Sequence, residues 1–246
     1  MRRFFVPPEW IEEGQALIRG EIAHRITQVL RMSQGDRVVL LDGTGSEYLV
    51  RLDEFGKHTV AGTVLAVSQG SNEPSIRITL CQGILKADKL EWVLQKGTEL
   101  GVSAFIPLIC QRSIPRFKST KGSQRMLRWG RIITEAAEQC GRSRVPDLSP
   151  PLEFRSACRS VDGASLALIP WEGARDASLK EALKGHNTSQ VYLFIGPEGG
   201  FQEEEVEYAQ GLGIIPVSLG KRILRAETAG LVATTAVLYE AGDLEG

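Results

Sequence analysis

The first part of the chain alternates short apolar runs with turn-forming residues, a pattern typical of β-strands. It predicts strands at residues 37–42, 47–52 and 58–67. Gly-containing turn signals at 42–45 and 54–57 separate these runs. Several short strands joined by tight turns predict a small all-β unit at the start of the chain.

One helix is expected among these strands, at residues 21–31, where apolar residues recur at helical spacing. Short strands around one helix predict a small barrel. Residues 68–75 are rich in Ser, Gly, Asn and Pro and have the composition of a linker. The pattern therefore divides the chain into a first domain at 1–70 and a second at 71–246.

After the linker, buried strands and amphipathic helices follow one another. The predicted strands lie at 76–82, 104–109, 165–170, 191–196 and 214–220. The predicted helices lie at 88–100, 123–140, 202–210 and 226–241. Continuous apolar strands that alternate with helices predict an α/β fold, with a parallel sheet covered by helices on both faces.

Two of these helices have distinctive features. Asp88 and Glu91 fit the N-cap and N3 positions of a start that resembles a capping box. The last helix carries a face of small residues, which permits close packing either in the core or across a dimer interface. This face consists of Ala226, Gly230, Ala233 and Thr234.

Composition narrows the class of protein without deciding its function. The chain is 42% hydrophobic and 24% charged, with a formal net charge of −1, as expected of a soluble globular protein without a uniformly basic surface. Four scattered cysteines and three histidines make a metal cluster unexpected and indicate buried, reduced thiols. We find no signal peptide or membrane-spanning run, so we expect a cytoplasmic protein with no membrane partner.

Three strand ends carry unusual residues, at 169–174, 195–201 and 218–229. In open α/β sheets, ligands bind beyond the carboxyl ends of the strands. We therefore expect these three segments to form one binding site.

The segment at 195–201, IGPEGGF, resembles a phosphate-binding loop but carries the wrong charges. Its glycines would let the backbone approach a ligand closely, yet the helix that follows opens with glutamates at 203–205. The P-loop and Rossmann glycine patterns are also absent. The loop favours a ligand with little negative charge, such as an adenine edge or a cationic sulfonium. The alternative is a tight strand-to-helix turn whose carboxylates only stabilise the helix.

The segment at 218–229 places Lys221, Arg222 and Arg225 before a helix that opens near Glu227. An arginine at a helix start can hold a phosphate or a polarised carbonyl group. The alternative is a solvated basic turn, and for Lys221 or Arg222 alone we favour that interpretation.

Other basic residues are candidates for contacts with a nucleic acid, whose phosphates attract Lys and Arg. Some lie in the first domain and some in the second. The candidates are Arg2, Arg3, Arg31, Arg112, Arg116, Lys118 and Arg128.

Taken together, LFIGPEGGF and the later LGKRILRAETA resemble the SPOUT class of RNA methyltransferases, and more narrowly the ribosomal RNA small-subunit methyltransferase E family. Further segments resemble that family in the same order along the chain, so the resemblance covers nearly all of it. These segments are MRRFF at the start, HRITQVLRMSQGD at 24–36, LQKGTELGV at 94–102 and ITEAAEQCGRSRVP at 133–146.

The resemblance implies a PUA-like β-barrel that binds RNA, followed by a domain with a C-terminal trefoil knot that binds S-adenosylmethionine. It also implies a homodimer, which would place the small face of the last helix at an interface. The implied reaction is methylation of N3 of a uridine in the decoding region of 16S rRNA, in the small ribosomal subunit. Transfer of a sulfonium methyl group needs no metal.

The chemistry of that reaction suggests roles for three residues. Arg225 is the first candidate to stabilise the developing uridine anion or to hold a neighbouring phosphate, and Glu198 and then Glu227 are candidates to accept the proton. The residues implied to line the cofactor pocket are Ile195, Gly196, Gly199, Gly200, Leu219, Gly220, Ile223, Leu224, Arg225, Trp171 and Glu172.

Three alternatives stay open on the sequence. One is a non-catalytic RNA-binding module with a degenerate pocket. Another is a SPOUT methyltransferase that acts on a different RNA nucleotide. The last is a Rossmann-type nucleotide enzyme, which the acidic turn at 203–205 argues against.

Overall fold

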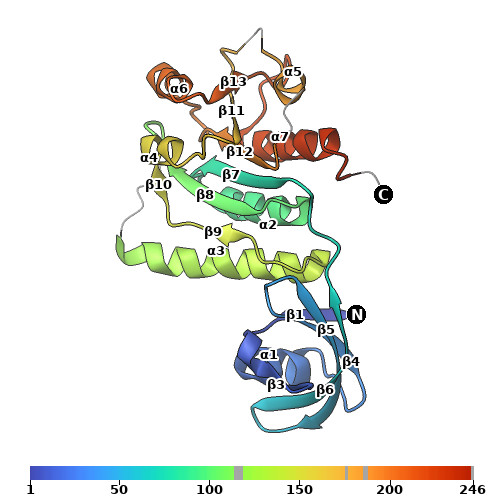
Figure 1. Ribbon diagram of the computed structural model, residues 1–246. Helices are drawn as coiled ribbons and strands as arrows, with labels where there is room; N and C mark the ends of the chain where they lie inside the picture. The colour runs from blue at the N-terminus through green and yellow to red at the C-terminus, as the bar shows by residue number, and fades with distance from the viewer. Residues whose placement is uncertain (114–118, 175–176, 185–187, 245–246) are drawn as a thin grey trace. The chain divides into compact units, whose positions relative to one another are not determined.

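The computed structural model describes residues 1–113, 119–174, 177–184 and 188–244 (Figure 1). The chain forms two compact units. The first contains Met1–Glu73 and Ala137–Val145, and the second contains Pro74–Ala136 and Pro146–Gly246. The first unit therefore includes a short segment that lies far along the chain.

The first unit is built on a six-stranded sheet whose strands follow the order β1-β4-β5-β6-β3-β2. Neighbouring strands are antiparallel except β1 and β4, which are parallel. The strands are β1 (Arg2–Phe5), β2 (Ile11–Glu12), β3 (Gln15–Arg19), β4 (Arg37–Leu41), β5 (Ser46–Phe55) and β6 (Thr59–Gln69). Side chains from β1, β3, β4, β5 and β6 meet in one apolar core, so the sheet wraps around its own interior.

Short helical segments complete this unit. A 3-10 turn, η1 (Pro8–Trp10), lies between β1 and β2. The predicted helix at 21–31 is present as α1 (Gly20–His24), which continues into the π-helical turn η2 (Arg25–Val29). The side chain of Ile26, in η2, is buried in the apolar core of the barrel.

The three strands expected in this region are confirmed as β4, β5 and β6. Strands β1, β2 and β3 were not predicted. These strands have two to five residues, which is too short for a two-residue periodicity to stand out.

Residues 137–145 join the first unit through buried polar contacts. Glu138 accepts hydrogen bonds from the backbone amide of Phe5 at 3.1 Å and from Arg25 at 3.0 Å. The Arg142 guanidinium is buried and pairs with Glu73 at 2.7 Å. Glu73 also accepts from the backbone amide of Ser143 at 3.0 Å. These bonds fix both the end of the linker and the end of the long helix in this unit.

The second unit contains a seven-stranded sheet in which every pair is parallel, as predicted. Its order is β10-β8-β7-β12-β11-β13, and β9 pairs with β8. The strands are β7 (Arg77–Gly83), β8 (Ala104–Ile109), β9 (Asp147–Leu148), β10 (Leu152–Glu153), β11 (Leu166–Pro170), β12 (Gln190–Ile195) and β13 (Ile215–Val217). The five predicted strands are all present.

Helices pack on both faces of this sheet, as expected. Leu80 and Ile195 face Gly230 of the last helix, whereas the adjacent Cys81 and Phe194 pack in a core with Phe154. Adjacent residues of a strand point to opposite faces, so two sets of helices cover the two faces. The helices are α2 (Lys89–Leu100), α3 (Ser119–Cys140), α4 (Phe154–Arg159), α5 (Leu179–Leu183), α6 (Glu203–Gln210) and α7 (Ala226–Glu240).

Two details of the helices differ from expectation. Asp88 occupies the N-cap of α2, but its side chain makes no cap hydrogen bond, and Glu91 binds Arg128 at 2.6 Å instead. The small face of α7 packs in the core, because Gly230, Ala233 and Thr234 are buried. A Cβ at Gly230 would lie 2.9 Å from Gln82 Oε1, so a larger residue would require the Gln82 side chain or α7 to shift. The expectation that this face forms an interface is wrong.

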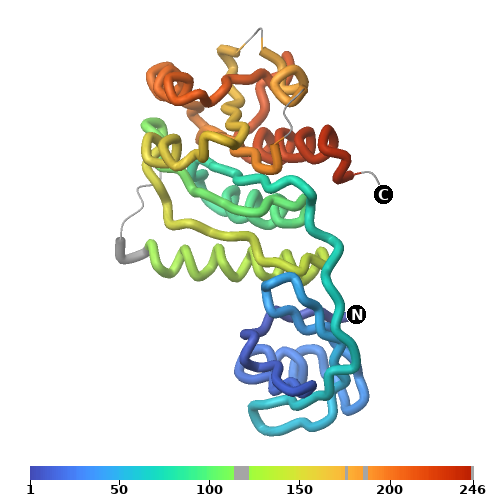
Figure 2. Tube along the Cα trace, viewed as in Figure 1, coloured from blue at the N-terminus to red at the C-terminus, as the bar shows by residue number. Residues whose placement is uncertain are grey.

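The path of the chain after β13 brings distant elements together (Figure 2). β13 pairs with β11 at one edge of the sheet. The chain then passes through residues 218–225 into α7, which packs against α2, β7 and β12. The last helix therefore returns to the middle of the sheet.

The remaining chemical expectations concern membranes, metals and thiols. Of the helices in the described ranges, none is both long and apolar enough to cross a membrane. The described side chains contain no group of three or more His, Cys, Asp or Glu that could hold a metal ion. Cys81, Cys110 and Cys158 are buried, and burial raises the pKa of each thiol, which disfavours the reactive thiolate.

Candidate active site

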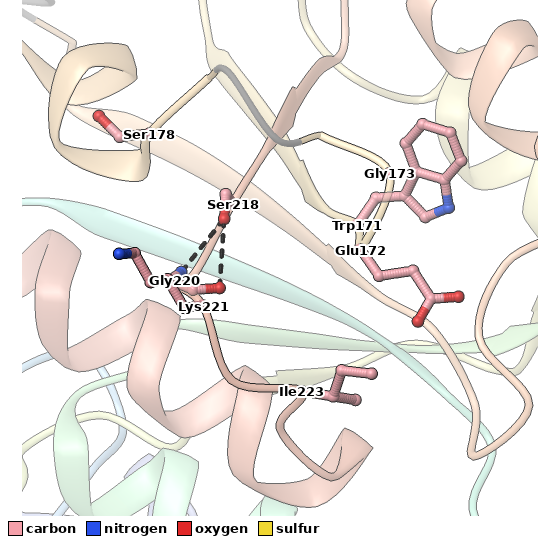
Figure 3. A pocket seen from close by; sticks show the side chains of 8 residues that line it. All are labelled: Trp171, Glu172, Gly173, Ser178, Ser218, Gly220, Lys221 and Ile223. Atoms are coloured by element: carbon pink, nitrogen blue, oxygen red, sulfur yellow. Dashed lines mark hydrogen bonds between the residues drawn. The ribbon is translucent and has the colours of Figure 1, made fainter.

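Four neighbouring strands of the second unit end at the same edge of the sheet. They are β7, β12, β11 and β13, which follow one another in the sheet order and are parallel. The segments after β11, β12 and β13, together with Lys89 at the start of α2, border a cavity of about 530 Å³. A wider adjoining cavity of about 880 Å³ shares several of its residues (Figure 3). The expected meeting of three strand-end segments is therefore present.

Every residue implied to line the cofactor pocket borders the smaller cavity, and so do the three catalytic candidates. The side chains come from two loops and from the end of β11. We call residues 195–201 the glycine-rich loop and residues 218–225 the basic loop. Several further residues were not proposed from sequence for this cavity: Lys89, Pro170, Pro197, Phe201, Ser218, Lys221, Arg222, Ala226 and Ala229.

Most of these additional residues are chain neighbours of predicted ones, so a wider window along the sequence would have included them. Lys89 is different, because it comes from the start of α2. No motif connects it to the two loops, and only the packing of α2 against α7 brings it to the cavity.

The glycine-rich loop requires glycine for geometric reasons. Gly200 has φ +70°, a left-handed conformation that other residues adopt at a cost, and its amide donates to Pro197 O at 2.9 Å. A Cβ on Gly83, at the end of β7, would lie 2.5 Å from Pro197 N. The loop backbone therefore lies directly against the end of the neighbouring strand.

Arg112 holds this loop from outside. Its guanidinium donates hydrogen bonds to the backbone oxygen of Gly199 at 2.8 Å and to the side-chain oxygen of Gln202 at 3.0 Å. The same group reaches Phe201 O at 3.5 Å. Arg112 was predicted to contact RNA, but the structure directs its donors to the loop.

Glu205 anchors the helix that follows the loop. It is buried, and its carboxylate accepts from the backbone amide of Gln202 at 2.9 Å and from that of Gln111 at 3.0 Å. The first of these bonds belongs to a capping box at the start of α6. Glu203 and Glu204 are exposed, so they keep the negative charge near this turn that disfavours a phosphate.

Glu198, a candidate base, is also held by the backbone. Its carboxylate accepts a hydrogen bond from the amide of Lys86 at 2.9 Å, although the side chain is exposed. This contact connects the glycine-rich loop to the turn between β7 and α2.

Glu227, the other candidate base, lies in the first turn of α7 and pairs with Lys89 at 3.1 Å. Burial acts to raise the pKa of its carboxyl group, but hydrogen bonds from its own backbone and from Lys89, with the charges of Lys89 and Arg225, hold that pKa below its ordinary value. Its Oε2 atom is buried and has no hydrogen-bond donor within the described part of the chain. Glu227 is therefore a carboxylate at neutral pH, with one oxygen left to accept a hydrogen bond.

Arg225 occupies the N-cap position of α7 and is exposed. Its backbone oxygen accepts hydrogen bonds from the amides of Thr228 and Ala229, which fixes its main chain. Its guanidinium has no hydrogen-bond partner among the residues that the structure describes. Arg225 therefore combines a fixed backbone with a guanidinium that can bind a ligand.

The wider cavity lies between the end of β11 and the basic loop (Figure 3). Trp171 and Glu172 lie on one side of it, and Ser218 and Lys221 on the other. Ile223 lines it while 85% exposed, which is unusual for an isoleucine.

The remaining RNA candidates have different surroundings. Arg2 and Arg31 are exposed on the first unit. Arg3 forms an ion pair with Glu47, and Arg128 forms one with Glu91. Arg116 and Lys118 lie outside the described residues. The RNA contacts of all these residues stay predictions.

Two family models match the chain. Residues 71–238 match the RNA methyltransferase domain, and residues 18–65 match the RNA methyltransferase PUA domain.

Curated relatives match over most or all of the chain. Ribosomal RNA small subunit methyltransferase E of Bacillus subtilis is 34% identical over 257 residues, which cover 100% of this chain and 99% of that protein. The protein of the same name from Synechocystis is 38% identical over 234 residues, which cover 94% of this chain and 75% of that protein.

Solved structures also match nearly all of the chain. Ribosomal RNA small subunit methyltransferase E from Neisseria gonorrhoeae, bound to S-adenosyl methionine, superposes with a TM-score of 0.88 and 33% identity over 96% of both chains. A Legionella pneumophila methyltransferase in complex with the same cofactor also gives a TM-score of 0.88, with 33% identity and 96% coverage of both chains.

Proposed function

The chain belongs to the ribosomal RNA small subunit methyltransferase E family, and we propose from this membership that it methylates N3 of a uridine in 16S rRNA, using S-adenosylmethionine as the methyl donor. The observation that carries the proposal is the cavity between the two loops, which is bordered by every residue that the family resemblance implies for the cofactor.

The residues around this cavity fit S-adenosylmethionine. A volume of about 530 Å³ lies within the usual range for cofactor sites. The glycine-rich loop offers backbone amides and carbonyls to an adenine edge, and Glu172, Glu198 and Glu227 place negative charge near a cationic ligand. Glu227 Oε2 also offers a buried acceptor that lacks a donor within the described residues.

S-adenosylmethionine supplies an electrophilic methyl group on a positively charged sulfur, so the protein has two further tasks. It must align the uridine N3 with that methyl group, and it must stabilise the negative charge that develops on the uracil as the N3 proton leaves. We assign the second task to Arg225, because its guanidinium is exposed at the cavity.

The N3 proton is replaced by the methyl group, so a base must accept it, directly or through water. Two carboxylates border the cavity as candidates. Glu198 is exposed and holds the Lys86 amide, whereas Glu227 is mostly buried, lies beside Arg225 and keeps one oxygen without a donor in the described part of the chain. We therefore favour Glu227 as the acceptor and regard Glu198 as a structural anchor, which reverses their order from the sequence.

The surrounding architecture belongs to the same proposal. We propose that residues 1–70 act as a PUA-like barrel that binds RNA, and that residues near 190–240 thread into a trefoil knot. We also propose that a second copy of the chain completes the site. Ile223 supports this, because it is 85% exposed at the wider cavity.

Two experiments separate this proposal from its alternatives. Calorimetry should show that the purified protein binds S-adenosylmethionine, whereas a non-catalytic RNA-binding module would give no heat. Mass spectrometry of 16S rRNA from a deletion strain should then show the loss of one 3-methyluridine, restored by the gene. Loss of a different modified nucleotide would favour a related methyltransferase with another target.

A further inference from the structure

The turn after β7, taken here as residues 86–89 and including the first residue of α2, contacts both candidate bases, although sequence patterns gave no reason to connect it with the site. The Lys86 amide donates to Glu198 at 2.9 Å, and the Lys89 ammonium group forms an ion pair with Glu227 at 3.1 Å. These contacts reach two loops that lie far along the chain. One four-residue turn therefore connects the glycine-rich loop to the start of α7.

The conformation of this turn is unusual. Ala87 has φ +50°, in the left-handed region that non-glycine residues rarely occupy. Strain of this kind persists where surrounding contacts determine the backbone, and it often occurs at functional sites. The two contacts on either side of Ala87 are such constraints.

Lys89 also lies where its own helix does not favour it. It is the first residue of α2, and positive charge is unfavourable at a helix N-terminus. The N-cap Asp88 makes no side-chain cap hydrogen bond that would offset this. Lys89 instead pairs with Glu227. Glu227 lies in the first turn of α7, where negative charge is favourable.

The pair leaves Glu227 half satisfied. Lys89 binds Oε1, while Oε2 is buried without a donor in the described part of the chain. A buried acceptor without a donor is unfavourable unless a ligand supplies one. On the proposed function, the N3–H of the target uridine is a donor of the required kind.

We propose that the 86–89 turn is a positioning element of the active site, in which Lys89 holds the Glu227 carboxylate as the acceptor of the uridine proton and the Lys86 amide fixes Glu198 as a structural anchor. The inference rests on the proposed methyl transfer to uridine. The proton passes from N3 to the Glu227 carboxylate, directly or through water, and N3 keeps the electron pair with which it bonds to the methyl carbon. Lys89 acts through Glu227 and is a positioning residue.

The first test measures Glu227 in the free protein, so it needs no activity. Carbon-13 NMR titration of the glutamate carboxyl groups, with Glu227→Gln to identify the signal, should give Glu227 a pKa below the ordinary value. Among the described residues, the charged groups that act on it are Lys89 of α2 and Arg225 at its own N-cap. Lys89→Met should raise this pKa, and Lys96→Met, which removes another lysine from α2, should leave it unchanged. An unchanged pKa in Lys89→Met would overturn the role of Lys89.

The second test follows single-turnover methyl transfer across pH at saturating cofactor. The rate should fall as pH drops through the pKa of Glu227, because the base must be ionised. Lys89→Met should lower the rate about tenfold or more and move this fall to higher pH, while Lys89→Arg should restore most of both. Cofactor affinity should change little in either variant. A Lys89→Met variant that binds the cofactor more weakly but keeps the wild-type rate and pH profile at saturating cofactor would make Lys89 a cofactor contact and overturn the proposal.

Two substitutions of Glu198 test whether it is a structural anchor or the base. Glu198→Gln keeps an oxygen that can accept from the Lys86 amide and should stay close to wild-type rate, whereas Glu198→Ala should weaken cofactor binding. A Glu198→Gln variant as slow as Glu227→Gln would show that Glu198 is the base. If the wild-type protein transfers no methyl group while the NMR result holds, the proposed function fails but the Lys89–Glu227 contact stands.

Discussion

The glycine-rich loop and the basic loop border the same cavity, but they are held in different ways. The first is fixed from three sides, by Arg112, by the Lys86 amide and by the capping box of Glu205. In the second, Lys221, Arg222, Ile223 and Arg225 are all exposed. A fixed wall suits the positioning of a cofactor, and exposed basic side chains suit contact with an RNA that must enter and leave.

The comparison assigns different kinds of defect to the two loops. Changes to the contacts that hold the glycine-rich loop should affect stability and cofactor affinity. Changes to the exposed charged side chains of the basic loop, Lys221, Arg222 and Arg225, should affect the rate of methyl transfer and the binding of RNA.

The largest effect is expected from Arg225→Ala. Loss of one preorganised donor to developing negative charge commonly lowers kcat by about 10²–10³. Single-turnover methyl transfer should show this loss, while calorimetry should show a much smaller change in cofactor affinity. Arg222→Ala is the matched control and should lose far less. Wild-type turnover by Arg225→Ala would remove this residue from the mechanism.

Glu205→Ala should lower the free energy of unfolding by about 2 kcal/mol, because it removes the buried acceptor of two backbone amides. Urea denaturation measures this change. Glu204→Ala removes an exposed carboxylate from the same turn and should stay within about 0.5 kcal/mol of wild type. Equal effects of the two substitutions would contradict the anchoring role of Glu205.

Arg112→Ala should weaken cofactor binding about tenfold, or about 1.4 kcal/mol, because the glycine-rich loop loses its outer contacts. The rate at saturating cofactor should stay near that of wild type. Arg128→Ala removes an arginine bound to Glu91 and should not change cofactor affinity. If Arg112→Ala weakens RNA binding and leaves cofactor affinity intact, the original prediction of an RNA contact is correct.

The smallest effect is expected from Lys221→Ala. A single phosphate contact contributes modestly to affinity, and its loss should lower the slope of log affinity against log salt by about 1. Filter binding to a 16S rRNA fragment at several salt concentrations measures this slope. An unchanged slope would mean that Lys221 is only a solvated charge.

Much of the second unit could be predicted from sequence, because its strands are continuous apolar runs between periodic helices. The small first-unit strands β1 to β3 could not, since two to five residues carry no usable period. The helix start at Asp88 was placed correctly, but its expected capping bond was not, because Glu91 has a stronger partner in Arg128.

The residues of the candidate site also divide into those that could be predicted from sequence and those that could not. Residues in the two loops were identified because glycine and arginine at strand ends have recognisable chemistry. Lys89 and the contact of Arg112 with the glycine-rich loop could not be identified, because both depend on contacts between segments far apart in the chain. Sequence thus indicated many of the residues that border the cavity, while the structure showed which of them hold the loops through hydrogen bonds.

The most direct test of the account supplies the purified protein with S-adenosylmethionine that carries a deuterated methyl group. The acceptor is small ribosomal subunits from a strain that lacks the gene, and mass spectrometry of the digested 16S rRNA locates the label. The account predicts one labelled 3-methyluridine. A protein that binds the cofactor but leaves every uridine N3 unlabelled would contradict it.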